Sequence, residues 1–408
     1  MKARKEIPLF KVFMSKLAQK NVKKVLDSGY IGQGPSVDLL EEKLKRNFNF
    51  PNVLTLNSGT SAIHLAIHLL KDKYKEYFVM ADGLQVVCKN INWGGLELGD
   101  TVLTTALTCT ATNWPILANN LKIKWVDIDP NTLNMSLDDL EKKLNKDSGL
   151  IVIVNWGGYP VDRIKLYEIV DRHYEKYGKS LAIIHDCAHS FGSKYFNEYL
   201  GEYSVIKNDK CLEFFAYSFQ AIKHFTTVDG GGLVCPNQSY LNRAKLIRWY
   251  GIDRNSNRKD FRCELPIEEW GFKFHMNDVN ASVGLANLEE SLNFVVAKHK
   301  ENGNFYNNNL KNIPGVTLLE NKEGFDSSYW VYTIKVDNQD DFFTKMKSKN
   351  IVVSRVHERN DIHPCVSSFR SDLPELDKIV KQMVCIPAGW WVSSEDRDYI
   401  LNSIKEGW

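Results

Sequence analysis

Lys223 lies in the stretch YSFQAIKHFTTVDGGG, residues 217–232, between small and hydroxyl side chains and a run of three glycines. Burial strips an ammonium group of its hydration, which lowers the pKa of a lysine amine and makes the amine nucleophilic. Such an amine can form a Schiff base with a carbonyl compound. Most lysines are solvated surface residues, so this chemistry requires matching groups elsewhere in the chain.

Asp186 and His189 are the first candidates for such groups. They belong to the sequence DCAHS and follow the apolar run 181–185, which predicts a buried parallel strand. Ligands of α/β sheets bind where the strands end. An aspartate at this place can also cap a turn, and a histidine can simply fill a gap in the core.

The turn NSGTS, residues 57–61, stands between a predicted strand, 53–56, and a predicted helix, 62–70. Free N–H groups and the positive end of the helix dipole make such a turn an anion site. The turn lacks the lysine of a P-loop and the spacing of GxGxxG, so it carries no nucleotide-binding motif. Combined with Lys223 and Asp186, it fits pyridoxal phosphate, which needs an amine, a carboxylate for its ring nitrogen and a phosphate site.

Composition limits the classes of protein that the chain can represent. Its 408 residues suffice for two domains, or for one large α/β domain with a smaller companion. The formal net charge of +2 gives no indication of nucleic-acid or membrane binding. The eight cysteines form no CxxC pair, which is typical of reduced thiols and not of a disulfide frame or a zinc site. Without a signal peptide or a membrane-spanning run, we expect a soluble cytoplasmic protein without a metal.

The remaining patterns predict the elements that must position these groups. Apolar residues at helical spacing predict a helix over residues 12–28, with Gly29 as its stop. Residues 71–98 are irregular and polar, and we expect a surface excursion there. Strands are predicted over residues 102–105, 123–128 and 150–155, and helices follow or separate them. This alternation is that of an α/β fold.

Four motifs carry a resemblance to a known family: SGTSAIHLA, DCAHSFG, SFQAIKHFTTVDGGG and GFKFHMNDVNASVGLANL. In this order they resemble the DegT/DnrJ/EryC1/StrS family of pyridoxal-phosphate-dependent nucleotide-sugar aminotransferases, and the likeness extends over nearly the whole chain. The resemblance implies an α/β, aspartate-aminotransferase-like (fold type I) architecture. Residues 1–250 would form the large cofactor-binding domain around a mostly parallel sheet, and residues 251–408 a smaller C-terminal α/β domain.

The resemblance also assigns roles to single residues. Lys223 matches the Schiff-base lysine, and Asp186 matches the carboxylate that keeps the pyridine nitrogen protonated. His189 falls where many members have glutamine, and it would face the ring hydroxyl or stack near it. The positions that match phosphate ligands are Gly59, Thr60 and Ser218.

Two further positions differ from the family pattern. Cys109 stands where most relatives place an aromatic ring over the cofactor, and a thiol offers less contact area than a ring. Lys273 stands where many relatives have an asparagine that reaches the cofactor phosphate of the neighbouring subunit. Its alternation with Phe272 and Phe274 also fits a half-exposed strand. The resemblance implies a homodimer whose active site lies at the subunit interface.

The implied activity moves an amino group from glutamate to a nucleotide-linked 4-keto-6-deoxy sugar. Arg355, His357 and His363 could meet the nucleotide or the donor carboxylate, or could be surface residues. Two alternatives are a keto-sugar dehydratase of the same fold, which has a histidine in place of the lysine, and a non-catalytic cofactor-binding regulatory relative. Lys223 argues against the first alternative, although His224 is its neighbour.

Overall fold

The computed structural model of the chain describes residues 5–71, 78–81, 84–87, 91–203, 206–254 and 266–408. A seven-stranded sheet forms its centre, with the strand order β1-β11-β10-β7-β6-β4-β5. These strands are β1 (Val53–Leu56), β4 (Thr101–Thr105), β5 (Lys122–Val126), β6 (Leu150–Val154), β7 (Leu181–Asp186), β10 (Cys211–Ser218) and β11 (Gly231–Val234). β11 runs antiparallel to both of its neighbours, and the strands from β10 to β5 are parallel. The sheet is therefore mostly parallel, as predicted.

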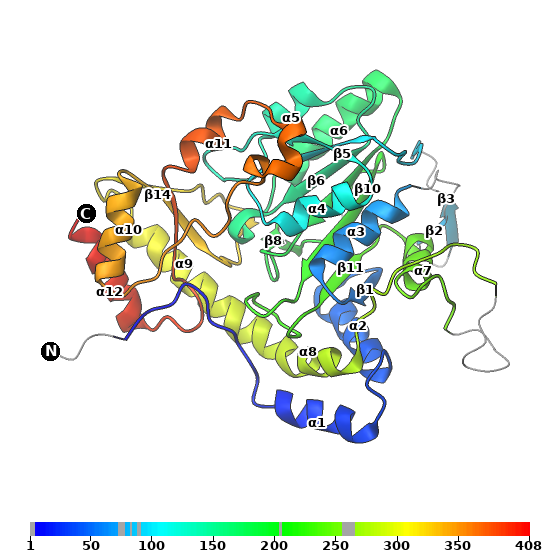
Figure 1. Cartoon of the computed structure of the whole chain (residues 1–408), viewed down its shortest axis with the longest axis horizontal. Helices are drawn as coiled ribbons and strands as arrows, with labels where there is room; N and C mark the ends of the chain where they lie inside the picture. The colour runs from blue at the N-terminus through cyan, green and yellow to red at the C-terminus, as the bar shows by residue number, and fades with distance from the viewer. Residues whose placement is uncertain (1–4, 72–77, 82–83, 88–90, 204–205, 255–265) are drawn as a thin grey trace.

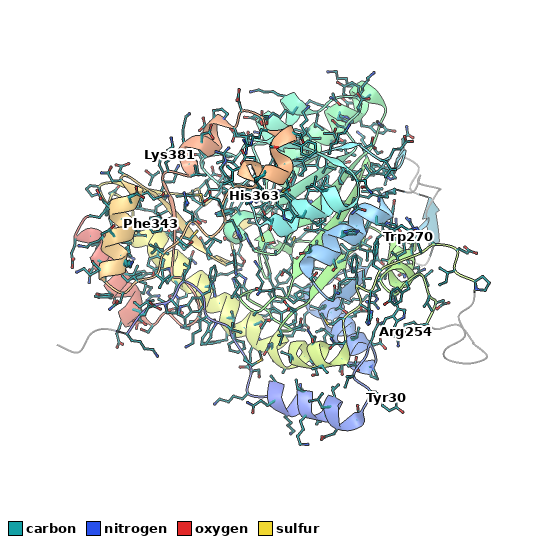
Figure 2. The ribbon with its side chains drawn as sticks, in the orientation of Figure 1. Tyr30, Arg254, Trp270, Phe343, His363 and Lys381 are labelled. Carbon is teal, nitrogen blue, oxygen red and sulfur yellow. The ribbon has the colours of Figure 1, made fainter. Side chains whose placement is uncertain are left out.

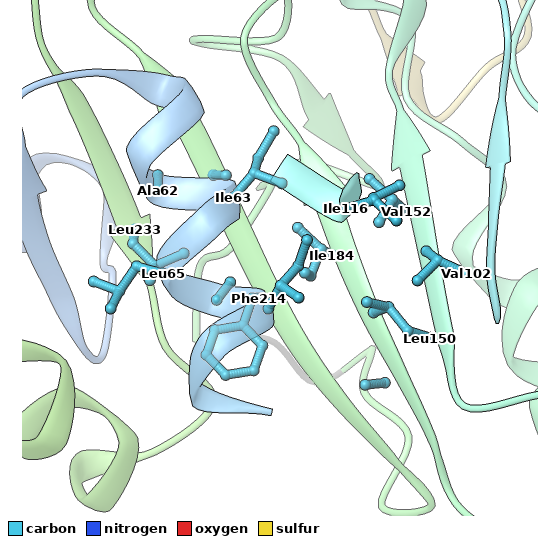
Figure 3. Packing of buried hydrophobic residues seen from close by; sticks show 14 of the residues in the cluster. Ala62, Ile63, Leu65, Val102, Ile116, Leu150, Val152, Ile184, Phe214 and Leu233 are labelled. Atoms are coloured by element: carbon cyan, nitrogen blue, oxygen red, sulfur yellow. The ribbon is translucent and has the colours of Figure 1, made fainter. Parts of the chain in front are cut away.

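Helices cover both faces of this sheet, because alternate strand residues point to opposite sides. Val152 and Ile184 face one layer, shown in Figure 3, and their neighbours Ile151 and Ile183 face the other. The first layer contains α3 (Gly59–Leu69), α4 (Thr110–Ala118) and α7 (Gln238–Ile247), and the second contains α5 (Leu137–Lys143) and α6 (Arg163–Tyr177). The apolar strand sequences thus follow from burial on both faces.

A smaller antiparallel sheet lies in the C-terminal part of the chain (Figure 1). It consists of β12 (Val316–Leu318), β14 (Tyr332–Val336) and β15 (Met383–Ile386). Its separate hydrophobic core includes residues of α9 (Ala297–Asn309), α10 (Gln339–Ser348) and α12 (Ser394–Lys405). The domain boundary at residue 250 stays a prediction.

One long helix connects the two sheets. Its first part, α8 (Asp278–Glu290), packs against α1 (Ala18–Ser28) and α2 (Pro35–Phe48), and a π-helical segment, η2 (Ser291–Val296), leads from it into α9.

The shorter elements are β8 (Lys194–Tyr195), β9 (Glu198–Tyr199), β13 (Phe325–Asp326), α11 (Pro374–Ile379), η1 (Trp156–Gly158), η3 (Asn360–Ile362) and η4 (Pro364–Phe369). Within the described ranges, no helix combines the length and the apolar character needed to cross a membrane.

One expectation about the elements was wrong, and another concerns a stretch that is described only in part. The helix predicted over residues 12–28 begins only at Ala18, because Ser15 is tied to α8 through its backbone N–H and its hydroxyl. The Ser15 N–H donates to Asn287 Oδ1 at 2.9 Å, and its hydroxyl donates to Glu290 Oε1 at 2.5 Å. The excursion expected over residues 71–98 contains a hairpin of β2 (Phe78–Ala81) and β3 (Leu84–Val87), while the rest of that stretch lies partly outside the described residues.

Candidate active site

The candidate site lies at the carboxyl edge of the central sheet, where β7 and β10 end side by side. The parallel register pairs Asp186, the last residue of β7, with Ala216 of β10, and β10 ends at Ser218. The N-terminus of α3 meets this edge at Gly59. The topology therefore brings the predicted carboxylate and the predicted anion site together, as expected for a mostly parallel α/β sheet.

Asp186 is held by two hydrogen bonds and is only 6% exposed. The hydroxyl of Thr112 donates to its Oδ2 at 2.6 Å, and the backbone N–H of Ala188 donates to its Oδ1 at 2.9 Å. Burial raises the pKa of this carboxyl, while the two donors and the Lys223 ammonium act in the opposite direction. The side chain therefore has a fixed orientation and a cationic neighbour.

Lys223 lies in the connection between β10 and β11 and is partly buried. Its Nζ lies 3.6 Å from the centre of the Trp330 ring. Burial lowers the pKa of the amine to about 8, although the charge of the Asp186 carboxylate favours the ammonium form. With this pKa, about a tenth of the amine is neutral, and hence nucleophilic, at pH 7, and the rest is ammonium.

Close backbone approach shapes the predicted phosphate site. Ser58 caps α3, because its side-chain oxygen accepts the N–H of Ser61 at 3.0 Å. The other N–H groups at the start of the helix have no partner within the helix, as in the first turn of any α-helix. A Cβ atom on Gly59 would lie 2.9 Å from the Ser218 Cβ, and one on Gly231 would lie 2.3 Å from the Ser58 carbonyl oxygen. Only glycine at both positions allows the helix N-terminus, Ser218 and β11 to meet. Thr60, in the first turn, is exposed.

Cys109 lies beside this arrangement as the N-cap residue of α4, in extended backbone conformation. Its thiol is free and partly exposed, and its position influences the pKa of Lys223. Thr112, which holds Asp186, belongs to the first turn of the same helix. One helix start therefore presents both the thiol and the hydroxyl to the site.

Lys273 has an exposed side chain, whereas its backbone is tied to the turn before α3. Its carbonyl accepts the side-chain N–H of Asn57 at 3.2 Å, and the Phe274 carbonyl accepts the Asn57 backbone N–H at 2.7 Å. Phe272 and Phe274 stack with their ring centroids 4.6 Å apart and are partly buried. The predicted alternation along this segment is confirmed, and it leaves the ammonium group at the surface.

His189 is 2% exposed and lies face to face with Trp330, with centroids 4.0 Å apart and planes inclined by 20°. The Nε2 atom of His357 lies 3.4 Å from the Nε2 atom of His189. His357 was one of several open candidates in the tail, and the structure brings it to the site. His363 instead lies next to Trp114, with ring centroids 5.7 Å apart.

Trp330 and Thr112 were not among the sequence candidates. A tryptophan in an apolar segment is typical of a core residue, so nothing local marked Trp330 as a neighbour of Lys223. Thr112 belongs to a run of threonines, LTCTAT, that precedes a predicted helix. That run was the only available signal, and it does not indicate which hydroxyl reaches Asp186.

The arrangement can be tested against the cofactor that the motifs predict. The partly buried amine of Lys223 fits an aldehyde, and the fixed carboxylate of Asp186 fits a protonated ring nitrogen. The helix N-terminus at Gly59 with Ser218 fits a phosphate. Fold and site together define a pyridoxal-phosphate-dependent enzyme with an aspartate-aminotransferase-like fold.

Comparison with known proteins agrees with this class. A model of the DegT/DnrJ/EryC1/StrS aminotransferase family matches residues 13–405. AtS13 from Actinomadura melliaura is 40% identical, with a TM-score of 0.89 over 99% of this chain and 100% of that chain. The sugar aminotransferase CalS13 from Micromonospora echinospora is 37% identical, with a TM-score of 0.87 over 98% and 100%. GDP-perosamine synthase from Escherichia coli O157:H7 is 25% identical over 98% of both chains.

The chain belongs to the DegT/DnrJ/EryC1/StrS aminotransferase family. This assignment confirms the predicted family, the fold type I architecture, the enzyme class and the cofactor pyridoxal phosphate.

Proposed function

We propose that the protein transfers an amino group from glutamate to a nucleotide-linked 4-keto-6-deoxy sugar, in the biosynthesis of an amino sugar. The observation that carries this proposal is the partly buried Lys223, whose amine pKa is lowered to about 8 beside Asp186. The similarity of the chain to a sugar aminotransferase and to a GDP-perosamine synthase supports a nucleotide-sugar substrate. The family resemblance supports glutamate as the donor.

Each site residue has a part in this reaction. Bound pyridoxal phosphate supplies an electron sink for the carbon that loses its proton. Lys223 would hold the cofactor through its aldehyde, and the same amine, when free, would move the proton as general base and general acid. Asp186, oriented by Thr112, keeps the ring nitrogen protonated. Gly59, Thr60 and Ser218 would hold the phosphate through backbone N–H and hydroxyl groups.

A dehydratase of this fold would need a histidine at the position of Lys223. The neighbouring His224 does not offer that alternative, because its Nε2–H donates to the Ser328 carbonyl at 3.0 Å. It is the amine of Lys223, and not the imidazole of His224, that lies near Asp186. A non-catalytic relative would bind the cofactor but would show no turnover with glutamate.

Two measurements test the proposed reaction. Borohydride reduction of the cofactor-loaded protein should fix the cofactor onto Lys223, as a peptide map would show. Turnover with glutamate should then be measured against a panel of nucleotide-linked keto-sugars that differ in nucleotide, in stereochemistry and in the position of the keto group, 3 or 4. Label on another lysine, or cofactor binding without turnover on any member of the panel, would contradict the proposal.

We further propose a homodimer in which Lys273 completes the phosphate site of the partner subunit. The exposed position of Lys273 supports this proposal, as do the large exposed apolar side chains of Tyr30 (84%) and Trp270 (66%). In Figure 2, Tyr30, Arg254 and Trp270 lie along one edge of the molecule. An ammonium–phosphate contact contributes roughly 1.5–3 kcal/mol, enough to affect cofactor retention.

Subunit complementation tests this contact, since Lys273 is also close to the N-terminus of α3 in its own chain. A Lys223→Ala chain is mixed with a Lys273→Ala chain, and heterodimer formation is verified separately. If Lys273 acts on the partner subunit, one site of the mixed dimer loses both lysines and the other keeps both, so activity rises above either parent. No rise in a proven heterodimer would show that each chain uses its own Lys273.

We also propose the cytoplasm as the compartment of the protein. The cysteines within the described residues are free thiols, which supports a reducing environment. Cys88 and Cys263 lie outside the described residues.

A further inference from the structure

We propose that His357 is a positioning residue that fixes the proton of neutral His189 on Nδ1, so that His189 presents an N–H donor to the cofactor. This inference deepens the proposed function and rests on it for the identity of the bound group. The pairing of the two rings, however, is a property of the chain itself.

The two imidazoles meet edge to edge. Their planes differ by 9°, their centroids are 5.4 Å apart, and their Nε2 atoms are 3.4 Å apart. In a face-to-face stack the facing nitrogens would be about as far apart as the centroids. The shorter nitrogen distance means that each Nε2 points at the other ring, which is the geometry of an N–H···N hydrogen bond.

Two tryptophans hold this pair in place. The indole of Trp330 lies nearly parallel to both rings, 4.0 Å from His189 and 6.0 Å from His357 between centroids. Trp156 meets both rings edge on, at 5.7 Å and 6.0 Å. Neither imidazole can rotate without displacing an indole, so the pairing of the Nε2 atoms is enforced by packing.

His189 has one further polar atom, and it has no protein partner. Its Nδ1 is buried and makes no hydrogen bond among the described residues. A buried N–H or lone pair without a partner is unfavourable, so a bound ligand that forms a hydrogen bond with this Nδ1 would be stabilised. Lys223, whose Nζ lies 3.6 Å from the centre of the same indole, would hold the cofactor aldehyde on this side of the site.

The proton positions follow from the neutrality of both rings. Burial and the Lys223 charge lower the pKa of His189 and of His357, and His357 and then His224 lower that of His189 further. A hydrogen bond between two neutral imidazoles requires one Nε2–H and one bare Nε2. If His357 donates, the proton of His189 must reside on Nδ1. An N–H at Nδ1 of His189 would stabilise the ionised hydroxyl of the cofactor ring, whereas a lone pair on Nδ1 would repel it.

The tautomer can be measured without any cofactor. Histidine is labelled with ¹⁵N, and the ring nitrogens of His189 in the apoenzyme are assigned by NMR near neutral pH. We expect a protonated Nδ1 and a bare Nε2 in the wild type. His357→Phe, which keeps a ring but lacks a donor, should shift the proton of His189 toward Nε2. His357→Gln, whose amide can donate, should restore it, and His363→Phe serves as the control outside the pair.

A second readout uses the loaded enzyme. Because His357→Phe loses the fixed donor to the ring hydroxyl, the pH midpoint of the visible cofactor band should rise by about one unit, a tenfold change in proton affinity. His357→Gln should keep the midpoint near that of the wild type. A wild-type His189 protonated on Nε2, or a tautomer unchanged in His357→Phe, would overturn the inference. The apoenzyme result does not depend on turnover, so a failed substrate panel and a failed tautomer test are distinguishable.

Discussion

Replacing Lys223 by methionine should stabilise the apoenzyme near neutral pH. The side chain keeps its unbranched apolar stem but loses the ammonium group that the site partly buries. In the wild type, the amine is mostly charged at pH 7 in both the folded and the unfolded chain. Only in the folded chain does the ammonium group lose hydration, and this loss destabilises the folded state. Methionine removes this difference and leaves the packing around Trp330 nearly intact.

The magnitude follows from the lowered pKa. A fall from 10.5 to about 8 corresponds to a penalty of about 3 kcal/mol at pH 7. The indole of Trp330, 3.6 Å from Nζ, favours the ammonium by roughly 0.5–2 kcal/mol, so about 3 kcal/mol is an upper value. The penalty is complete below the folded pKa and disappears as the pH rises from about 8 toward 10.5, because the folded chain then binds fewer protons than the unfolded chain.

Urea unfolding of the two apoenzymes at equal concentration measures this effect. The variant should be more stable by about 1–3 kcal/mol at pH 7, and the difference should shrink to about 1 kcal/mol or less at pH 10. Lys381→Met is a matched control, since Lys381 is exposed (Figure 2). A Lys223→Met variant that is no more stable than the wild type at pH 7, or a gain that persists unchanged at pH 10, would refute the account of the lysine environment.

Three further substitutions test the other parts of the site. Asp186→Asn should keep the cofactor but lower turnover on the order of 100-fold, because an amide cannot stabilise the protonated ring nitrogen; equal turnover at matched cofactor content would contradict this. Gly231→Ala would place a Cβ 2.3 Å from the Ser58 carbonyl oxygen, so the cofactor dissociation constant should rise roughly tenfold or more. Cys109→Tyr should tighten cofactor binding by roughly 0.5–1.5 kcal/mol through added ring contact, and weaker binding in the same titration would show that the ring does not fit.

The sequence predicted the parts of the site that depend on local patterns. Asp186 follows a strand that the sequence predicted, and Gly59 lies in the turn predicted before α3, whereas Ser218 was indicated only by its match to a family motif. A parallel sheet brings such strand ends to one edge, so the fold class implied their proximity. Lys223 was marked by its glycine-rich surroundings and by the match to a family motif.

Other features depend on contacts between distant segments and could not be predicted in this way. The start of α1 is displaced because Ser15 bonds to Glu290 of α8, and helical periodicity carries no information about that contact. Trp330 and His357 come from the C-terminal part of the chain, and only tertiary packing brings them to His189. Nothing in the sequence around Trp330 indicated chemistry, and His357 was only one of three polar candidates in the tail.

The segment that carries Trp330 also determines where Lys223 lies. The indole Nε1–H of Trp330 donates to the Ile222 carbonyl at 2.9 Å, and His224 donates to the Ser328 carbonyl at 3.0 Å. Ile222 and His224, the two residues next to Lys223, therefore form hydrogen bonds with residues just before β14 of the smaller sheet. Lys223, which lies in a connection between two strands of the large sheet, is thus held in place by the C-terminal part of the chain. A displacement between the two sheets would accordingly move the amine relative to Asp186, which belongs to the central sheet alone.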